Sequence, residues 1–230
     1  MYKAYSASVI GINKKSNQDA HSVYESSKYL ICIVADGLGS SKLSEIGSYQ
    51  ATRAVRKAIT QWRSLNNSDS NVLLQLIQFY WNLFINDLSL AKKDCLTTCL
   101  FVYIDKVASK GLICQLGDGM IVFNTCSETY ITPKSIDFNY TKALGSAKNI
   151  SDWSVKSISF NNQDMQFFIA TDGVSDDITE NKEFHFLNYL IDEMNNIKEN
   201  GRNRFLKSIL QDWPTKFHKD DKTICIAWRK

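Results

Sequence analysis

Residues 29–37 are YLICIVADG, an unbroken apolar run that stops at Asp-Gly. The run is rich in residues that favour strands, so it predicts a buried strand. The same form recurs much later in the chain, where Met165–Ala170 is followed by Thr171, Asp172 and Gly173. Both stretches therefore place an aspartate directly after a buried strand, in a dipeptide that is also a common turn former.

Strands and helix pairs are predicted around these two stretches. Apolar residues recur at helical spacing in Ser44–Trp62, Asn71–Leu90, Glu183–Ile197 and Asn203–Trp213. Asp69 or Ser70 is a suitable cap for the second helix. Further strands are predicted at Tyr2–Ile10, Thr97–Ile104, Leu112–Leu116, Met120–Asn124, Thr129–Thr132, Trp153–Phe160 and Thr223–Trp228. This order lacks the strand–helix alternation of a parallel sheet, so we expect an α+β fold with antiparallel sheets covered by helices.

Length and composition limit the class of protein. The 230 residues contain no linker or low-complexity tract, so we expect a single domain over residues 1–230. The net charge of +3 is small and the basic residues are dispersed, which argues against nucleic-acid binding. With no leader-like start and no run long enough to span a membrane, we expect a soluble cytoplasmic protein that does not bind membranes. Most of the six cysteines lie in apolar runs and none forms a CxxC pair, so we expect reduced, buried thiols.

Aspartates recur where predicted strands end or turns begin. Taken alone, each is most simply a turn former. As a set they predict a cation site, because clustered carboxylates repel one another without a cation, and hard oxygen ligands suit Mg²⁺ or Mn²⁺. No group of histidines and cysteines competes for zinc. The members are Asp19, Asp36, Asp118, Asp172 and the neighbouring pair Asp220 and Asp221.

Seven short motifs in the chain resemble, in the same order, those of the protein phosphatase 2C family of metal-dependent serine/threonine phosphatases. They are GINKKSNQD (11–19), VADGLGSSKLSEIGS (34–48), LTT (96–98), LGDG (116–119), TKALG (141–145), ATDGVSD (170–176) and DDKT (220–223). The resemblance runs from about Ser6 to Trp228 and implies a bacterial-type, stand-alone domain. Its fold would be an α-β-β-α sandwich, in which two antiparallel sheets are flanked by helix pairs.

The resemblance also implies a site for two divalent cations, Mn²⁺ or Mg²⁺. The ligands would be the carboxylates of Asp19, Asp36, Asp172 and Asp220 together with the backbone carbonyl of Gly37. Asp36 would bridge both ions, and Asp118 would share a third, weaker site with Asp172. Asp221 is the alternative to Asp220, which we favour because Lys222 and Thr223 then fit the closing motif. A hydroxide that bridges the cations would attack phosphoserine or phosphothreonine.

Several positions depart from the family pattern. Lys14 stands where the family has the arginine that binds phosphate, so we expect weaker phosphate binding from a side chain without the bidentate fork. Leu38-Gly39-Ser40 stands where some members carry a histidine general acid. His21, His185 and His218 are expected at surface or helix positions without a catalytic role. Of the three, His21 is the strongest candidate for a role, because it lies two residues after Asp19. The polar segment Pro133–Asp152 coincides with the family's flap and is expected to be a surface excursion, near the cleft or simply solvated.

Three functions remain open from the sequence. The first is a phosphatase acting on a phosphorylated protein, such as the product of a partner kinase. The second is a catalytically weak or silent member that serves as a regulatory or binding module, which Lys14 and the loss of glycine at Ser44 and Leu96 favour. The third is an unrelated α+β metal-dependent phosphohydrolase that acts on a small molecule.

Overall fold

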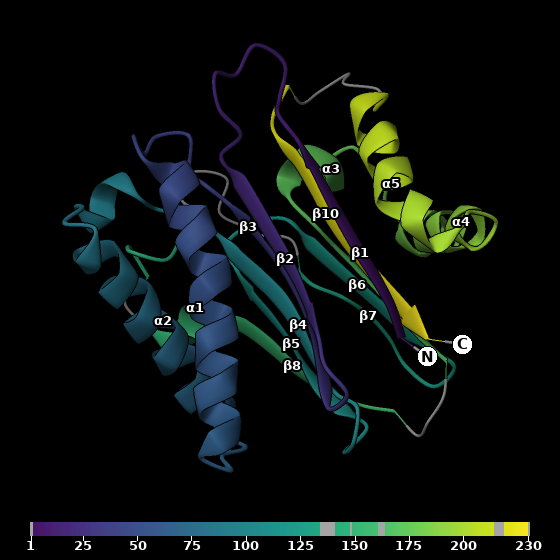
Figure 1. The fold of residues 1–230 in the computed structure, drawn as a ribbon, viewed down its shortest axis with the longest axis horizontal. Helices are drawn as coiled ribbons and strands as arrows, with labels where there is room; N and C mark the ends of the chain where they lie inside the picture. The colour runs from purple at the N-terminus through teal and green to yellow at the C-terminus, as the bar shows by residue number, and fades with distance from the viewer. Residues whose placement is uncertain (1, 134–140, 148, 161–163, 214–218, 230) are drawn as a thin grey trace.

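The protein folds as two antiparallel sheets stacked face to face, with a pair of helices on each outer face (Figure 1). The structure is a computed structural model that describes residues 2–133, 141–147, 149–160, 164–213 and 219–229. It confirms the expected α+β class and the α-β-β-α sandwich.

Each sheet, within the described residues, has five strands. The first sheet has the order β1-β10-β9-β6-β7, with bounds Tyr2–Val9, Lys222–Arg229, Met165–Ala170, Met120–Thr125 and Thr129–Ile131. The second has the order β2-β3-β4-β5-β8, with bounds Asp19–Glu25, Tyr29–Asp36, Cys99–Asp105, Lys110–Leu116 and Ser154–Ser159. The chain passes from one sheet to the other between β1 and β2, between β5 and β6, between β7 and β8, and between β8 and β9.

Two long helices cover the second sheet and two shorter ones cover the first. The helices are α1 (Ser44–Ser64), α2 (Ser70–Asp87), α3 (Asp172–Ser175), α4 (Glu183–Asn195) and α5 (Arg202–Gln211), with 3₁₀ turns at Lys92–Asp94, Ile150–Asp152 and Glu199–Gly201. Asp69 is the cap of α2, as one of the two expected candidates, because its side chain accepts a hydrogen bond from the Asn71 backbone N–H at 2.8 Å. No helix in the described part of the chain combines the length and the apolar character that crossing a membrane requires.

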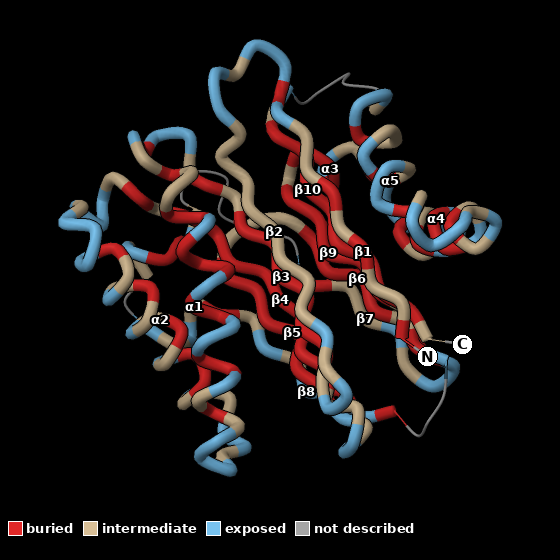
Figure 2. The backbone as a smooth tube through the Cα atoms, viewed as in Figure 1, coloured by how far each residue is buried: buried red, intermediate tan, exposed pale blue. Residues whose placement is uncertain are grey.

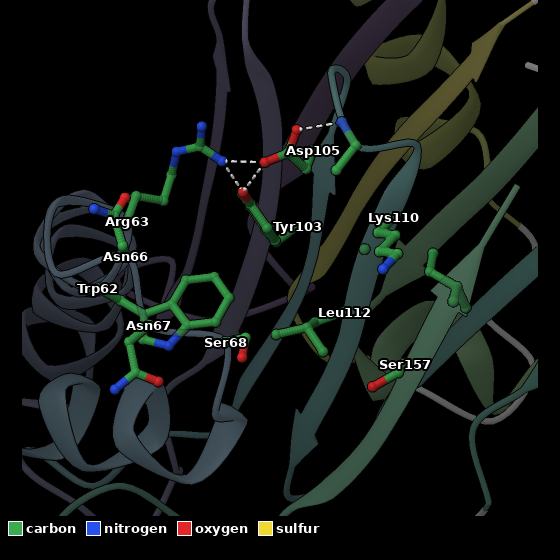
Figure 3. Close-up of a pocket in the computed structure, with 13 residues that line it drawn as sticks. Trp62, Arg63, Asn66, Asn67, Ser68, Tyr103, Asp105, Lys110, Leu112 and Ser157 are labelled. Carbon is green, nitrogen blue, oxygen red and sulfur yellow. Dashed lines mark hydrogen bonds and ion pairs between the residues drawn. The ribbon is translucent and has the colours of Figure 1, made fainter.

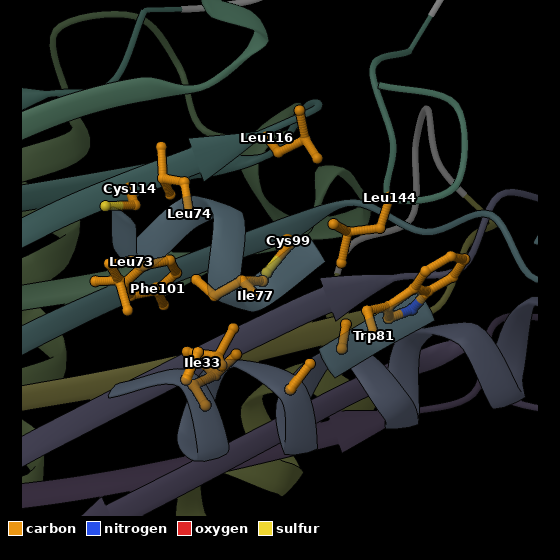
Figure 4. Packing of buried hydrophobic residues seen from close by; sticks show 14 of the residues in the cluster. Ile33, Leu73, Leu74, Ile77, Trp81, Cys99, Phe101, Cys114, Leu116 and Leu144 are labelled. Carbon is orange, nitrogen blue, oxygen red and sulfur yellow. The ribbon is translucent and has the colours of Figure 1, made fainter. Parts of the chain in front are cut away.

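Three apolar clusters hold the layers together, and they account for most of the buried chain (Figure 2). One lies between α1, α2 and the second sheet, where Trp81 and Ile77 of α2 pack over Cys99 and Phe101 of β4 (Figure 4). The second fills the space between the two sheets, and the third lies under α4 and α5. Burial of each large apolar side chain stabilises the fold by about 1.5–3 kcal/mol.

The cysteines and most predicted elements agree with the expectations. All six cysteines are free, and all but Cys126 are buried. The sequence patterns missed two elements, the strand β2 and the short helix α3. The sequence of β2 is DAHSVYE, and every residue except the last is only half-buried, so the strand has no apolar alternation to reveal it.

Candidate active site

Strand register brings the first two aspartates together. In the antiparallel pair of β2 and β3, Asp19 lies directly opposite Asp36. Asp19 therefore begins its strand, whereas Asp36 ends one, and both lie at the same end of the second sheet. Residues that face one another in this way have Cβ atoms about 5 Å apart.

Neighbouring hydroxyl groups hold this pair in place. The Asp19 Oδ2 atom accepts a hydrogen bond from Thr171 Oγ1 at 3.0 Å, which links the two sheets because Thr171 follows β9 of the first sheet. The Asp36 carbonyl accepts hydrogen bonds from Thr97 Oγ1 and the Thr98 backbone N–H, both at 2.8 Å. The Thr98 hydroxyl in turn accepts from the Asp36 N–H at 2.9 Å. The two threonines of the LTT motif thus fix the end of β3.

Gly37 lies where a larger residue has no room. A Cβ at this position would come within 2.6 Å of the Ser44 carbonyl oxygen at the start of α1. The Gly37 N–H donates to the Gln18 carbonyl at 3.1 Å, which ties the end of β3 to the β1–β2 loop. The glycine therefore allows the start of α1 to pack closely against the Asp36 turn.

The first sheet contributes two more aspartates at the same end (Figure 1). Asp172 is the first residue of α3, directly beyond β9, and Asp118 lies in the turn between β5 and β6. That turn is tight: Gly119 has a φ of +94°, and a Cβ there would be 2.6 Å from the Ala170 carbonyl at the end of β9. The Asp118 Oδ2 atom accepts a hydrogen bond from Thr141 Oγ1 at 3.0 Å.

Asp220 and Asp221 differ sharply in their surroundings. Asp221 is buried, and its carboxylate accepts hydrogen bonds from the backbone N–H groups of Gly11 at 2.7 Å and Gln18 at 2.8 Å. Asp220 has a side chain that is 35% exposed, and it forms an ion pair with Lys14. The Asp221 carboxylate therefore holds the β1–β2 loop in place, whereas the Asp220 carboxylate lies beside the other aspartates of the acidic cluster.

Without a bound cation, the negative charges of the clustered carboxylates repel one another. Burial, and then repulsion from Asp19 and Asp172, raise the pKa of Asp36 well above its ordinary value. Burial also raises the pKa of Asp19 to about 6. Burial, and then repulsion from Asp118, raise the pKa of Asp172 to about 7, and burial raises that of Asp118. A cation bound among such carboxylates would favour their ionised form.

These shifts predict that acid stabilises the protein when divalent cations are removed. An unfolded aspartate loses its proton near pH 3.8, whereas folded Asp172 keeps its proton up to about pH 7. The folded state therefore binds more protons over this range, and stability falls as the pH rises from about 4 to about 7. In a chelator, we expect the melting temperature of Asp172→Asn to exceed that of the wild type by a margin that grows over the same range. If the difference in melting temperature between the variant and the wild type became smaller as the pH rises, the raised pKa of Asp172 would not be its cause.

The histidines do not belong to the acidic cluster in the described part of the chain. His21 lies half-buried in β2, with its Nδ1 atom 2.8 Å from Ser6 Oγ, and burial lowers its pKa. His185 is exposed on α4, and His218 lies outside the described residues.

The segment Pro133–Asp152 was expected to be a polar surface excursion, and this is wrong for the middle of the segment. Ala143 and Leu144 are buried, and the Leu144 N–H donates to the Thr97 carbonyl at 2.8 Å, while residues 134–140 and 148 lie outside the described part.

A cavity of about 410 Å³ lies away from the aspartates, between the α1–α2 corner and strands β4, β5 and β8 (Figure 3). Trp62, Tyr103 and Leu112 line it, and Arg63 forms an ion pair with Asp105 at 2.5 Å on one side. Asp105 ends β4, whereas the threonines that hold Asp36 precede the start of that strand. The cavity and the acidic cluster therefore lie at opposite ends of the second sheet.

Solved structures share this arrangement of sheets and helices, so the fold of the chain is one that known proteins also adopt. The serine/threonine phosphatase Stp1 from Staphylococcus aureus matches with a TM-score of 0.72 and 18% identity, covering 100% of this chain and 96% of that one. RsbX in complex with magnesium matches with a TM-score of 0.65 and 17% identity, covering 99% and 94%. A bacterial serine phosphatase matches with a TM-score of 0.71 and 16% identity, covering 100% and 98%. No curated protein matches the chain.

The model of the protein phosphatase 2C family matches residues 12–211. The chain belongs to the protein phosphatase 2C family.

Proposed function

We propose that the protein is a metal-dependent protein serine/threonine phosphatase that hydrolyses phosphoserine and phosphothreonine. The observation that carries this proposal is the arrangement of aspartates from both sheets at one end of the sandwich, with carboxyl pKa values raised by burial and mutual repulsion. The substrate would be a phosphorylated protein of the kind that a serine/threonine kinase produces. Membership of the phosphatase family and its fold support the same class of reaction.

The side chains at this end suit divalent cations in their chemistry. The donors are carboxylate oxygens, which Mg²⁺ and Mn²⁺ prefer. The Oδ1 atom of Asp19 is buried and has no hydrogen-bond partner among the described residues, so one ligand oxygen is left available. Asp19, Asp36, Asp172, Asp220 and the carbonyl of Gly37 would hold two cations, with Asp36 between them and Asp118 at a third, weaker site. When bound, the cations would neutralise the carboxylates, polarise the phosphoryl group and make a water molecule more acidic.

The protein's own residues would orient the substrate around this centre. Lys14, on the β1–β2 loop, would contribute a positive charge to the phosphoryl oxygens, as a single point charge and not as a bidentate fork. Leu38-Gly39-Ser40 follows Asp36 and Gly37 and offers no imidazole to protonate the leaving oxygen. The threonines that hold the Asp36 backbone would fix the end of β3 from which its carboxylate projects.

Two observations favour the alternative, a silent member that acts as a regulatory or binding module. In the described residues, no group of three His, Cys, Asp or Glu side chains is arranged so that it could hold a metal ion as it stands. Lys14 also pairs with Asp220, one of the proposed ligands. If a cation binds under the phosphatase proposal, the carboxylates would have to turn toward it, which side chains at strand ends can do without a backbone change.

A hydrolysis assay separates the two functions. With Mn²⁺ or Mg²⁺, we expect the protein to release phosphate from p-nitrophenyl phosphate and from phosphoserine and phosphothreonine peptides. Excess EDTA should abolish the release, because the cations would stabilise the charge that develops on the phosphoryl oxygens, and added Mn²⁺ should restore it. Sugar phosphates and nucleotides serve as the comparison. Absence of turnover on every substrate, in protein that calorimetry shows to bind Mn²⁺, would favour the binding module.

A further inference from the structure

The Lys14 side chain lies against the carboxylates that precede β10. Its ammonium group pairs with Asp220 Oδ1 and lies 3.1 Å from Asp221 Oδ2. The side chain is 26% exposed, and the Nζ atom is 3.5 Å from Gln18 Oε1. Lys14 therefore pairs with both carboxylates, while the Lys222 ammonium donates to the Asp220 backbone carbonyl at 3.0 Å.

The two carboxylates that pair with Lys14 differ in burial and in their other hydrogen bonds. Asp221 has a side chain with no exposure and accepts two backbone N–H groups besides Lys14, so it remains in place whatever binds nearby. Asp220 is partly exposed, and its Oδ1 atom also accepts the Asp221 backbone N–H at 2.7 Å. Only the Asp220 pair can be exchanged for another cation without breaking the attachment of the β1–β2 loop.

A divalent cation that binds Asp220 would compete with the Lys14 ammonium for the same carboxylate. Both are positive, and at contact distance their repulsion opposes simultaneous binding to one partly buried carboxylate. The divalent ion carries twice the charge, so it is the stronger partner for the oxygen. When Asp220 is taken, Asp221 still holds the lysine near the site, because its Oδ2 atom remains within reach of Nζ.

We propose that Lys14 is a tethered counter-ion of Asp220, which a divalent cation must displace, and that metal binding thereby releases the ammonium toward the phosphoryl group of the substrate. The inference rests on the proposed function, because it needs Asp220 to be a metal ligand. It makes phosphate binding depend on metal loading through one side chain. It also sets the metal affinity below that of a site without the lysine.

Calorimetric titration of the metal-free protein with MnCl₂ tests the competition. We expect Lys14→Gln to bind Mn²⁺ about threefold to tenfold more tightly than the wild type, because a charge-assisted contact no longer has to be broken. Lys14→Arg should stay at or below the wild-type affinity, since it keeps the charge. Lys15→Gln is the matched control: it removes a charge from the adjacent, exposed position and should leave the affinity unchanged.

The wild-type protein offers a second measurement that does not depend on any variant folding. Acetylation of lysines by a soluble N-hydroxysuccinimide ester, followed by peptide mass spectrometry, reports how free each amine is. We expect Lys14 to react several-fold faster in Mn²⁺ than in chelator, with Lys15 unchanged.

Equal or weaker Mn²⁺ binding by Lys14→Gln, or no change in Lys14 reactivity with metal, would overturn the inference while leaving the metal site intact. No Mn²⁺ binding by the wild type at all would instead remove the proposed function, and the inference with it.

Discussion

Replacing Asp36 with asparagine is expected to lower the turnover of p-nitrophenyl phosphate in saturating Mn²⁺ by at least about a thousandfold. The substitution keeps the shape of the side chain and removes the charge at the centre of the acidic cluster, where Asp36 faces Asp19 across the strand pair. The measurement is kcat under saturating metal and substrate. Loss of less than tenfold would contradict the central place given to Asp36.

The same variant carries a signature that simple damage to the fold would not produce. Because burial and neighbouring carboxylates raise the pKa of Asp36, a neutral amide there should raise the melting temperature of the metal-free protein at pH 7.5. We expect Mn²⁺ to raise the melting temperature of the wild type, and this increase should be smaller in the variant. Asp192→Asn on α4, an exposed position, is the control and should change neither quantity.

Replacing Asp221 with alanine is expected to reduce the free energy of unfolding by about 3 kcal/mol, with or without metal. The buried N–H groups of Gly11 and Gln18 would lose their acceptor, and the β1–β2 loop would lose its attachment to the first sheet. Urea unfolding in chelator measures the effect.

The neighbouring residue provides the matched comparison. Asp220→Ala should leave the stability of the metal-free protein within about 1 kcal/mol of the wild type, because its ion pair is partly exposed. It should instead weaken Mn²⁺ binding. The reverse pattern, with Asp220 needed for stability and Asp221 for metal binding, would exchange the roles assigned to the pair.

Elements with strong periodic patterns could be predicted from the sequence. The run YLICIVA forms β3, and the helical spacing after Ser44 and Asn71 forms α1 and α2, within a few residues of the expected bounds. The strand β2 could not be predicted, because its residues are half-buried on both faces and its place is fixed by pairing with β3. Tertiary contact, and not local propensity, makes it a strand.

The candidate site could be predicted as a list of aspartates but not as an arrangement. The difference between Asp220 and Asp221 depends on which backbone N–H groups come near, and these belong to a loop about two hundred residues earlier in the chain. The hydroxyl group of Thr171 that reaches Asp19 is likewise a long-range contact. The sequence did not indicate that Leu144 enters the core beside Thr97, because the surrounding segment Pro133–Asp152 is mostly polar.

The acidic cluster is split between two sheets that are separated by their own apolar layer. Asp19 and Asp36 belong to one sheet, and Asp172 and Asp220 adjoin strands of the other. The bulk of the residues packed between the sheets, such as Phe167 and Phe123, therefore acts as a spacer that sets the gap between the two halves. A change of core volume far from any aspartate would alter that gap, so the distance between the two halves of the acidic cluster depends on the thickness of the apolar layer as well as on the carboxylates themselves.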